Sequence, residues 1–396
     1  MAKIGTSLSK IPRSVWALGF VSLLMDVSSE MIHGLLPVFL VTGLGASAAT
    51  LGLIDGIAEA TASITKVYSG WLSDRLGKRK LLALVGYGLS ALTKPLFPWA
   101  STVFEVLVAR FFDRVGKGIR GAPRDALIAD VTPPDIRGAA FGLRQGLDTV
   151  GAFAGPLIAV MLMWALAGNI RAVFAWAIVP ALLCVAMLFF GVREPDGLQA
   201  SKAARTPIRW GEMAAIGQAF WIVVGLGGAV TMAQFSEAFL LLRAQGAGLP
   251  IALVPLVLVL MNLVYAAVSA PAGGLSDRID RRLVLGAGMA VLIAADLTLA
   301  LSGNLLAVLA GVALWGCSLG LTQGVIAAMI ADAAPARLRG TAFGLYNLVT
   351  GVLLLASSGL AGGLWTAFGP AAAFFTGAWF AALAGFGVIL VVRRRR

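Results

Sequence analysis

Charged residues are scarce in this chain of 396 residues. Only 13% of its side chains belong to Asp, Glu, Lys or Arg, about half the share found in soluble globular domains. Hydrophobic residues make up 59%, and the mean hydropathy is +0.91. Long apolar runs predict membrane-spanning helices, whereas the short alternating segments of a membrane β-barrel are missing. The chain is therefore predicted to be an all-α polytopic membrane protein.

Histidine and cysteine are nearly absent, with one His and two Cys in the whole chain. A single histidine excludes the HExxH zinc site of metalloproteases, and no GxxxxGK[ST] loop is present to hold the phosphates of ATP. Cys184 and Cys317 lie within apolar runs, so neither a disulfide nor a metal cluster is expected. We expect no enzymatic activity, no metal and no cofactor.

Basic residues outnumber acidic ones, and the net charge is +12. Most of them stand at the ends of apolar segments, as in membrane proteins, so we expect a lipid bilayer and no nucleic acid as the partner. Their gathering in the loops of one side predicts both termini in the cytoplasm and a location in the cytoplasmic (inner) membrane. The predicted spans are 15–41, 50–72, 81–99, 103–130, 139–163, 171–191, 217–242, 250–273, 283–302, 305–332, 340–364 and 370–392.

One long polar break, at 193–212, divides the spans into two sets of six. GWLSDRLGKRKLL at 70–82 returns as GGLSDRIDRRLVL at 273–285, and LIADVTPPDIRGAAFGL at 127–143 returns as MIADAAPARLRGTAFGL at 329–345. A parallel repeat predicts two similar bundles with a binding site between them at the membrane midplane. We expect an N-terminal bundle at 1–192, a cytoplasmic linker at 193–214 and a C-terminal bundle at 215–396.

The repeated loop after the second span resembles the loop signature of the major facilitator superfamily (MFS), and the resemblance extends over essentially the full length. It implies twelve transmembrane helices in two pseudo-symmetric six-helix bundles that work by alternating access. It also implies a conformational latch at this loop and its second copy, although Asp280 stands where the signature has glycine. The residues of this latch are Gly70, Asp74, Arg75, Gly77 and Arg79, with Asp277, Arg278 and Arg281 in the second copy.

Two further motifs support the resemblance. Arg110 in span 4 matches an arginine to which the superfamily gives a proton-sensing role, whereas Asp113-Arg114 departs from the family pattern. Gly151, Gly155 and Pro156 in span 5 resemble the signature of exporters and antiporters. A motif of this form packs helices closely across small residues and distorts the helix at proline.

Ionisable residues inside the first six spans fall on single helix faces. Asp26, Glu30 and His33 are spaced i, i+4 and i+7, and Asp55 and Glu59 are one turn apart. Adjacent carboxylates repel when both are ionised, which suits proton uptake. These five residues and Arg110 are the candidates for proton coupling. A purely structural network of ion pairs remains the alternative.

The chain is thus predicted to be a secondary active transporter, and proton-coupled efflux of a small organic solute is the first choice. A proton-coupled importer of an organic anion or zwitterion is the alternative, and a receptor or scaffold that does not transport is a third possibility from another class. We expect a monomer whose partners are the solute, protons and the bilayer. The candidate solute-binding residues are Lys94, Arg114, Gln234, Glu237, Tyr265, Gln323 and Asn347.

Overall fold

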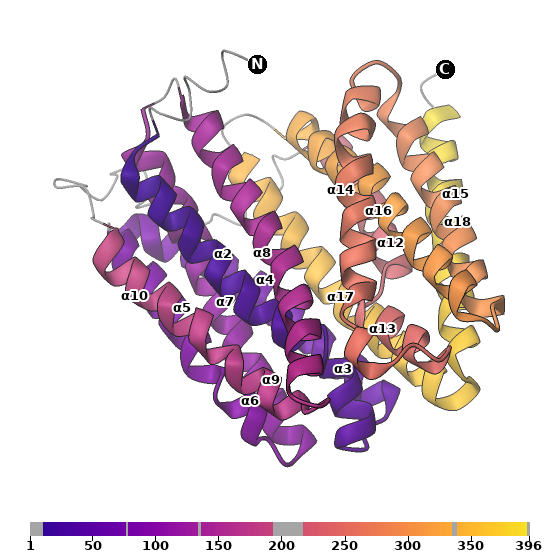
Figure 1. Ribbon diagram of the computed structural model, residues 1–396. Helices are drawn as coiled ribbons and strands as arrows, with labels where there is room; N and C mark the ends of the chain where they lie inside the picture. The colour runs from indigo at the N-terminus through magenta and orange to yellow at the C-terminus, as the bar shows by residue number, and fades with distance from the viewer. Residues whose placement is uncertain (1–10, 77, 134–135, 193–216, 335–338, 394–396) are drawn as a thin grey trace. The chain divides into compact units, whose positions relative to one another are not determined.

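Helices make up nearly all of the computed structural model, which describes residues 11–76, 78–133, 136–192, 217–334 and 339–393 (Figure 1). No strand occurs in these ranges. In chain order, the helices are α2 (Arg13–His33), α3 (Leu36–Val38), η1 (Phe39–Gly43), α4 (Ala48–Leu76), α5 (Arg79–Thr93), α6 (Leu96–Trp99), α7 (Val103–Val131), α8 (Arg137–Ala165), α9 (Ile170–Trp176), α10 (Ile178–Gly191), α12 (Gln218–Ala233), α13 (Ala238–Gly246), η4 (Ile251–Leu253), α14 (Leu256–Ser276), α15 (Arg281–Leu301), α16 (Leu305–Ala333), α17 (Arg339–Phe368) and α18 (Pro370–Arg393).

Ten of these helical stretches are long and apolar enough to cross a membrane. The two long helices outside this group, α4 and α7, have 29 residues each and carry several charges. Together they give the twelve helices expected of the fold, at positions that match the predicted spans. The prediction of an all-α polytopic protein is confirmed.

Helix α7 begins at a capping box. The Thr102 hydroxyl accepts from the backbone N–H of Glu105, and the Glu105 carboxylate accepts from the backbone N–H of Thr102. Such reciprocal bonds satisfy donors that the first turn of a helix leaves free. Glu105 is therefore a cap at the helix end, rather than one of the interior charges with which its position in span 4 would group it.

The internal repeat is visible in the helix boundaries. Helix α16 begins and ends 202 residues after α7. Asn304 caps α16 where Thr102 caps α7. The offset equals that between the repeated segments at 127–143 and 329–345, which confirms the repeat for this pair of helices.

The chain divides into two contact units. Unit 1 contains residues 1–36 and 61–207, and unit 2 contains 37–60 and 208–396. Helix α4 thus contributes its first part to unit 2 and the remainder to unit 1. The predicted linker at 193–214 lies outside the described residues, and the predicted bundle limits stay a prediction.

Within unit 1, α2 packs against α8 and α10, and α5 packs against α7. Its core includes Val15, Leu18, Met25 and Tyr87. Within unit 2, α15 packs against α16 and α18, and α14 packs against α16. The core of unit 2 is aromatic around Phe235, Phe239, Trp315 and Phe374.

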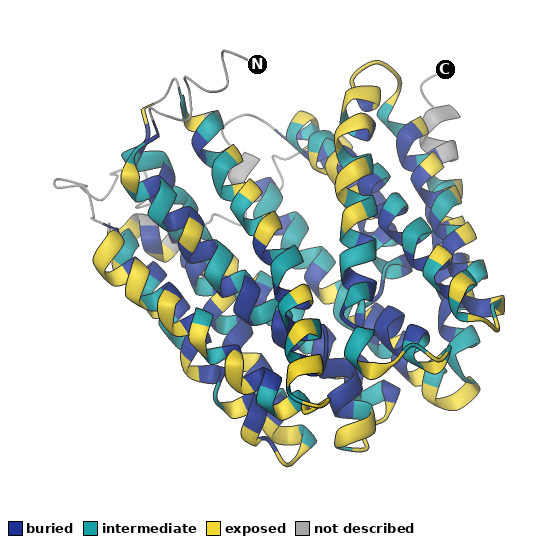
Figure 2. Cartoon of the chain, in the orientation of Figure 1, coloured by how far each residue is buried: buried dark blue, intermediate teal, exposed yellow. Residues whose placement is uncertain are grey.

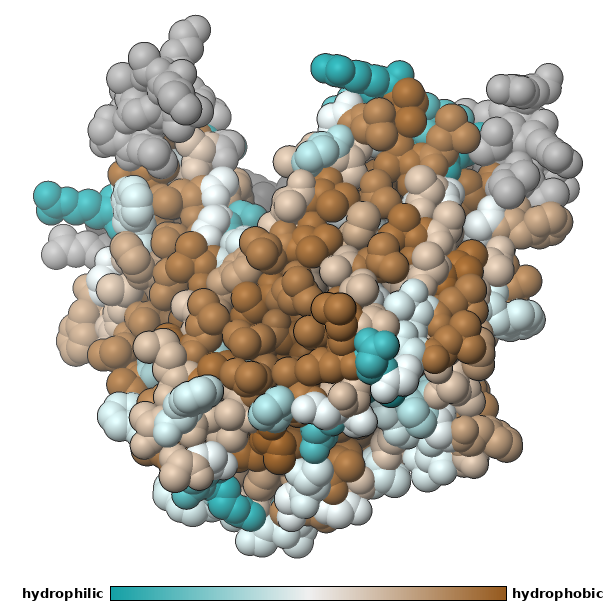
Figure 3. All heavy atoms as spheres, turned by 45° about the vertical axis from the view of Figure 1, so that its right-hand side comes forward, coloured by the Kyte–Doolittle hydropathy of each residue, from teal (hydrophilic) through white to brown (hydrophobic). Residues whose placement is uncertain are grey.

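Large apolar side chains are also exposed along the helices, as in Leu182, Leu183 and Phe190 of α10. Figure 2 shows exposed positions in yellow along the helices. Brown apolar residues gather across the face shown in Figure 3. Exposed apolar surface of this extent suits lipid rather than water. Both cysteines are free thiols; Cys184 is buried and Cys317 is half-buried.

Candidate functional site

A buried ion pair joins two helices of unit 1. The Lys94 Nζ lies 3.0 Å from Asp113 Oδ1 and also donates to the Ser29 hydroxyl at 3.0 Å. Both ions are almost completely buried. Paired and hydrogen-bonded ions are the form in which charge is tolerated in an apolar interior. The pair therefore fixes the end of α5 to α7, and Ser29 extends the contact to α2.

Arginines occupy the buried side of α7 around this pair. Arg110, Arg114 and Arg120 are 3%, 6% and 6% exposed. Arg120 donates to the Ser90 hydroxyl at 2.7 Å, and its guanidinium lies 4.8 Å from the centre of the Tyr87 ring. These arginines share the buried side of α7 with Asp113, whereas Lys117 is exposed.

A second charged group connects α7 to α8. The Arg124 Nε lies 3.0 Å from Asp125 Oδ1, and the Arg144 Nη1 lies 2.8 Å from Asp148 Oδ2. Cross-contacts of 3.7 to 3.9 Å join the two pairs. We call these four residues the ion-pair network. They match the structural alternative for the charges of these two spans.

Asp26, Glu30 and His33 lie on one face of α2. His33 Nδ1 lies 3.4 Å from Glu30 Oε2. Asp26 is half-buried, and it forms no hydrogen bond or ion pair among the described residues. The other described acids of unit 1 are engaged by a basic residue, by a helix cap or by His33. Among the described acids of unit 1, Asp26 is therefore the one without a fixed partner.

The Gly151 and Gly155 motif of α8 packs against this same part of α2. A Cβ added at Gly151 would lie 2.9 Å from Asp26 Cβ, and one at Gly155 would lie 2.6 Å from Glu30 Cβ. Pro156 follows inside the helix. Small residues allow this approach of two backbones. The motif thus sets the position of the two carboxylates as well as the spacing of the helices.

Asp55 belongs to unit 2, as does Glu59, whereas Asp26 and Glu30 belong to unit 1. Asp55 is 4% exposed, and its Oδ2 accepts from the Ser236 hydroxyl at 2.7 Å. Ser236 lies between the predicted solute-binding residues Gln234 and Glu237, which are half-buried. The structure thus places Asp55 beside the segment 234–237.

The remaining polar candidates of unit 2 do not form one cluster of hydrogen bonds. The described hydrogen bonds do not join the side chains of Tyr265, Gln323 and Asn347 to each other or to Gln234. Gln323 is exposed, and Tyr265 and Asn347 are half-buried. Their part in solute binding stays a prediction.

The first copy of the latch loop contains an ion pair between helix ends. Arg79 Nη1 lies 2.5 Å from Asp130 Oδ2 at the end of α7. A Cβ at Gly70 would be 3.4 Å from Ala122 Cβ, so α4 and α7 approach closely here. Arg75 is exposed. Gly77 and the side chain of Asp74 lie outside the described residues.

The second copy repeats the same pair. Arg281 contacts Asp332 at the end of α16 and lies 3.7 Å from Asp277. Arg278 is exposed. Asp280 caps α15 by accepting from the backbone N–H of Arg282 at 2.9 Å. The aspartate that replaces the glycine of the signature therefore has a structural use. Asp280, Arg281 and Asp332 line a pocket of about 810 Å³ with residues of α12.

Comparison with known proteins identifies the family of this chain. The sequence profile of the Major Facilitator Superfamily matches residues 18–262 and 239–396. The chain belongs to this superfamily. An uncharacterised MFS-type transporter of Methanocaldococcus jannaschii is 30% identical over 388 residues, which is 96% of each chain. The crystal structure of a bacterial homologue of the human lysosomal transporter Spinster, inward-facing and occupied, has a TM-score of 0.77 at 16% identity and covers 96% of each chain.

Two relatives that match about half of the chain have more specific names. The cis,cis-muconate transport protein of Acinetobacter baylyi is 28% identical over 51% of this chain and 48% of its own length. The multidrug resistance protein MdtH of Cronobacter sakazakii is 27% identical over 48% of this chain and 45% of its own length. The chain is thus an integral, multi-pass membrane transporter of the MFS, not an enzyme.

In this MFS protein, sequence reasoning left Asp113 and Ser29 out of the candidate site. Asp113 was visible as a departure from the family pattern, and a lone acid among the arginines of α7 indicates a buried counter-ion. Ser29 is a small hydroxyl residue next to Glu30, and nothing in the sequence distinguishes it from other serines in apolar spans.

Proposed function

We propose that this MFS transporter is a proton-coupled exporter that exchanges protons for a small organic solute. In this proposal Asp26 and Glu30 carry the protons and His33 assists Glu30. The remaining predicted coupling residues, Asp55, Glu59 and Arg110, are assigned supporting roles. The observation that carries the proposal is that Asp26, one helical turn from a second carboxylate, has no partner in the described part of the chain.

The charges of unit 1 separate into two kinds. Acids with a fixed basic partner, such as Asp113 and Asp148, hold helices together, and protonation of such an acid would break its ion pair. Asp26 is half-buried and has no such partner among the described residues. A carboxyl group in this setting gains and loses a proton without breaking an ion pair. Ionisable groups of this kind inside a membrane protein mark proton pathways.

Export rather than import is supported by the motif on α8. Gly151 and Gly155, which resemble the exporter signature, approach α2 at Asp26 and Glu30. A change in the spacing of α2 and α8 would therefore move Asp26 and Glu30 together. The similarity to a multidrug resistance protein over about half of the chain favours the same direction.

The test uses purified protein in liposomes with an acidic interior. Protein oriented for export should then accumulate an organic cation such as ethidium, while a pH dye trapped inside reports proton loss. The variants Asp26→Asn and Glu30→Gln should lose accumulation but keep exchange of labelled for unlabelled solute. Asp125→Asn, a neighbour in the ion-pair network, is the matched control and should still accumulate the solute.

Two results would contradict the proposal. If both carboxylate variants accumulate solute as the wild type does, the coupling assignment is wrong. If the wild type shows exchange but never accumulation with an acidic interior, coupled export is wrong.

Import of an organic anion is the second candidate, and the half-length similarity to a muconate transport protein favours it. The basic residues Lys94, Arg110 and Arg114 would suit such an anion. Lys94 already has Asp113 as a counter-ion, so it is less available to bind an anionic solute. Uptake of cis,cis-muconate into the same liposomes with an acidic exterior, in preference to ethidium export, would establish this function instead.

We also propose that the protein is a monomer in the cytoplasmic membrane with both termini in the cytoplasm. The bias of basic residues supports this topology. Green fluorescent protein fused to the C-terminus folds only in the cytoplasm, so a dark fusion with normal expression would contradict the orientation. The mass of the detergent-solubilised protein, measured by light scattering, tests the monomer.

A further inference from the structure

Asp296 is a buried carboxylate in unit 2 that the proposed function does not use. It lies in α15 with 0% exposure, on the same buried side as Leu292, Leu299 and Ala300. Neither of its oxygens has a hydrogen-bond partner among the described residues. It also forms no ion pair there.

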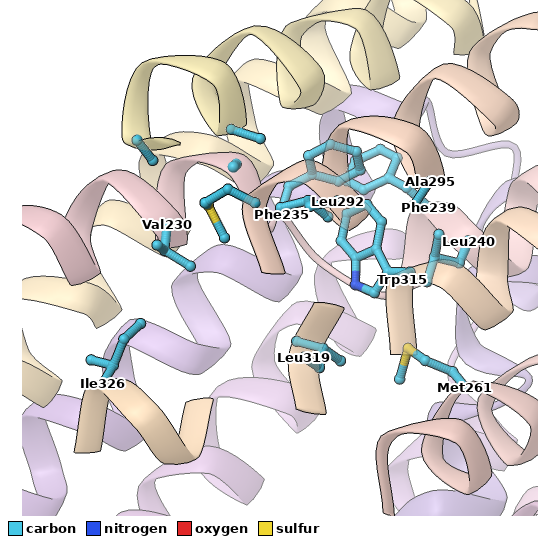
Figure 4. Packing of buried hydrophobic residues seen from close by; sticks show 14 of the residues in the cluster. Val230, Phe235, Phe239, Leu240, Met261, Leu292, Ala295, Trp315, Leu319 and Ile326 are labelled. Carbon is cyan, nitrogen blue, oxygen red and sulfur yellow. The ribbon is translucent and has the colours of Figure 1, made fainter. Parts of the chain in front are cut away.

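Aromatic rings surround the position. A Cβ at Gly377 of α18 would lie 2.7 Å from Asp296 Oδ2 and 3.0 Å from Phe235 Cε1. The Phe235 ring lies 5.3 Å from the Trp315 ring and 5.5 Å from the Phe374 ring, measured between centroids. Figure 4 shows Phe235, Phe239 and Trp315 gathered beside Leu292 and Ala295 of α15. The carboxyl group of Asp296 is therefore packed against apolar groups, and there is no room for even a methyl group at Gly377.

The internal repeat shows which ion-pair partner Asp296 lacks in unit 2. In unit 1, a Cβ at Gly86 of α5 would contact Arg120 of α7; in unit 2, a Cβ at Gly288 of α15 would contact Thr322 of α16. Both members of the second pair follow the first by 202 residues. At this offset Asp296 is equivalent to Lys94, and Trp315 is equivalent to Asp113.

Unit 1 thus has a complete ion pair at the place where unit 2 has an acid and an indole. The Lys94–Asp113 pair is closed at 3.0 Å. In unit 2 the acid has no cation, and the Trp315 Nε1–H also has no acceptor among the described residues. An ionised carboxylate without a partner is strongly disfavoured in such surroundings, and a carboxyl group there neutralises instead.

We propose that Asp296 is a proton-binding site of unit 2, occupied at neutral pH while the aromatic cluster is packed around it. The proton is the ligand that fits, because it needs no cavity. Loss of the proton would leave a charge beside Phe235 and Gly377. The cluster would then have to open, or the unused N–H of Trp315 would have to turn toward the carboxylate. The proposal does not depend on proton-coupled transport.

The ionisable groups on the elements packed against α15 do not neutralise Asp296. Arg243 of α13 donates to the backbone oxygens of Leu299 and Ser302. In the described parts, Tyr265 lies on α14 and Cys317 and Asp332 lie on α16, while α18 has no ionisable residue before Arg393 at its end. Asp332 is bound to Arg281 at the other end of α15.

Infrared spectroscopy of the purified protein tests the proposal without a transport assay. A protonated carboxyl group has a carbonyl-stretch band that an ionised one lacks, and incorporation of ¹³C-labelled aspartate shifts the bands that belong to aspartate. The wild type should show such a band at neutral pH, and Asp296→Asn should lose it. Asp113→Asn is the matched control, since its ion-paired carboxylate contributes no such band. Asp26→Asn separates any contribution of the carboxyl on α2.

The outcomes are distinct. A labelled band that disappears in Asp296→Asn and persists in both other variants supports the proposal. If no protonated aspartate band is present in the wild type at neutral pH, or if the band is the same in Asp296→Asn, the proposal is overturned. Should Asp296→Asn not fold, Asp296→Ala makes the same comparison, and the wild-type spectrum alone still decides the first point. Failure here leaves the coupling role of Asp26 untouched.

Discussion

Replacement of Gly155 by alanine tests whether the close contact of α2 and α8 is needed. The added Cβ would lie 2.6 Å from Glu30 Cβ and 2.9 Å from the Val27 carbonyl oxygen. Both are parts of the α2 backbone or directly attached to it, so no rotamer change relieves the clash. An ordinary carbon contact requires the two helices to separate by about 0.8 Å, and overpacking of this kind costs about 1–3 kcal/mol.

Thermal unfolding in detergent measures the stability effect. We expect Gly155→Ala to lower Tm on the order of 2–6 °C, and to slow solute exchange because Glu30 is displaced. Gly146→Ala is the matched control: it is the same change in the same helix, at a position with no neighbouring atom within 4 Å. If the two variants have the same Tm and the same exchange rate, the argument from close packing is refuted.

Three further predictions concern the charges and caps of unit 1. Lys94→Met should lower the free energy of unfolding by about 3–5 kcal/mol because it leaves Asp113 buried without its cation. Adding Asp113→Asn should recover much of the lost Tm, and a double variant no more stable than Lys94→Met would refute this. Arg79→Gln breaks a pair that is less buried, so the free energy of unfolding should fall by less than about 1 kcal/mol, while solute exchange should slow. Unchanged exchange would argue against a latch at this loop. Thr102→Ala should lower the free energy of unfolding by about 0.5–2 kcal/mol because it removes the cap of α7, whereas Ser101→Ala should leave it unchanged. An equal loss of stability in both variants would contradict the role of the cap.

Much of the fold was predictable because the length and composition of apolar runs identify membrane-spanning helices. The apolar runs and the repeated loop gave the number and positions of the spans. The grouping of Asp26, Glu30 and His33 on one face was also predictable, because helical spacing alone decides it. The capping box of Glu105 was readable too, since Thr102 stands three residues before it.

Contacts between helices were not predictable in the same way. The pairing of Lys94 with Asp113 depends on how far α5 and α7 are rotated about their axes, which composition does not specify. Asp55 has the same spacing to Glu59 as Asp26 has to Glu30, yet it bonds to Ser236, 181 residues away. The isolation of Asp296 likewise becomes visible only when the neighbouring rings are in place.

The state of the two cysteines has a practical consequence for spectroscopy. Cys184 is sealed in the core of unit 1, so a maleimide reagent should reach only the half-buried Cys317. A single replacement, Cys317→Ser, should therefore give a background that is silent to thiol labels. Spin labels at two introduced cysteines, one in each unit, would then report distances during the transport cycle without removal of the native core residue.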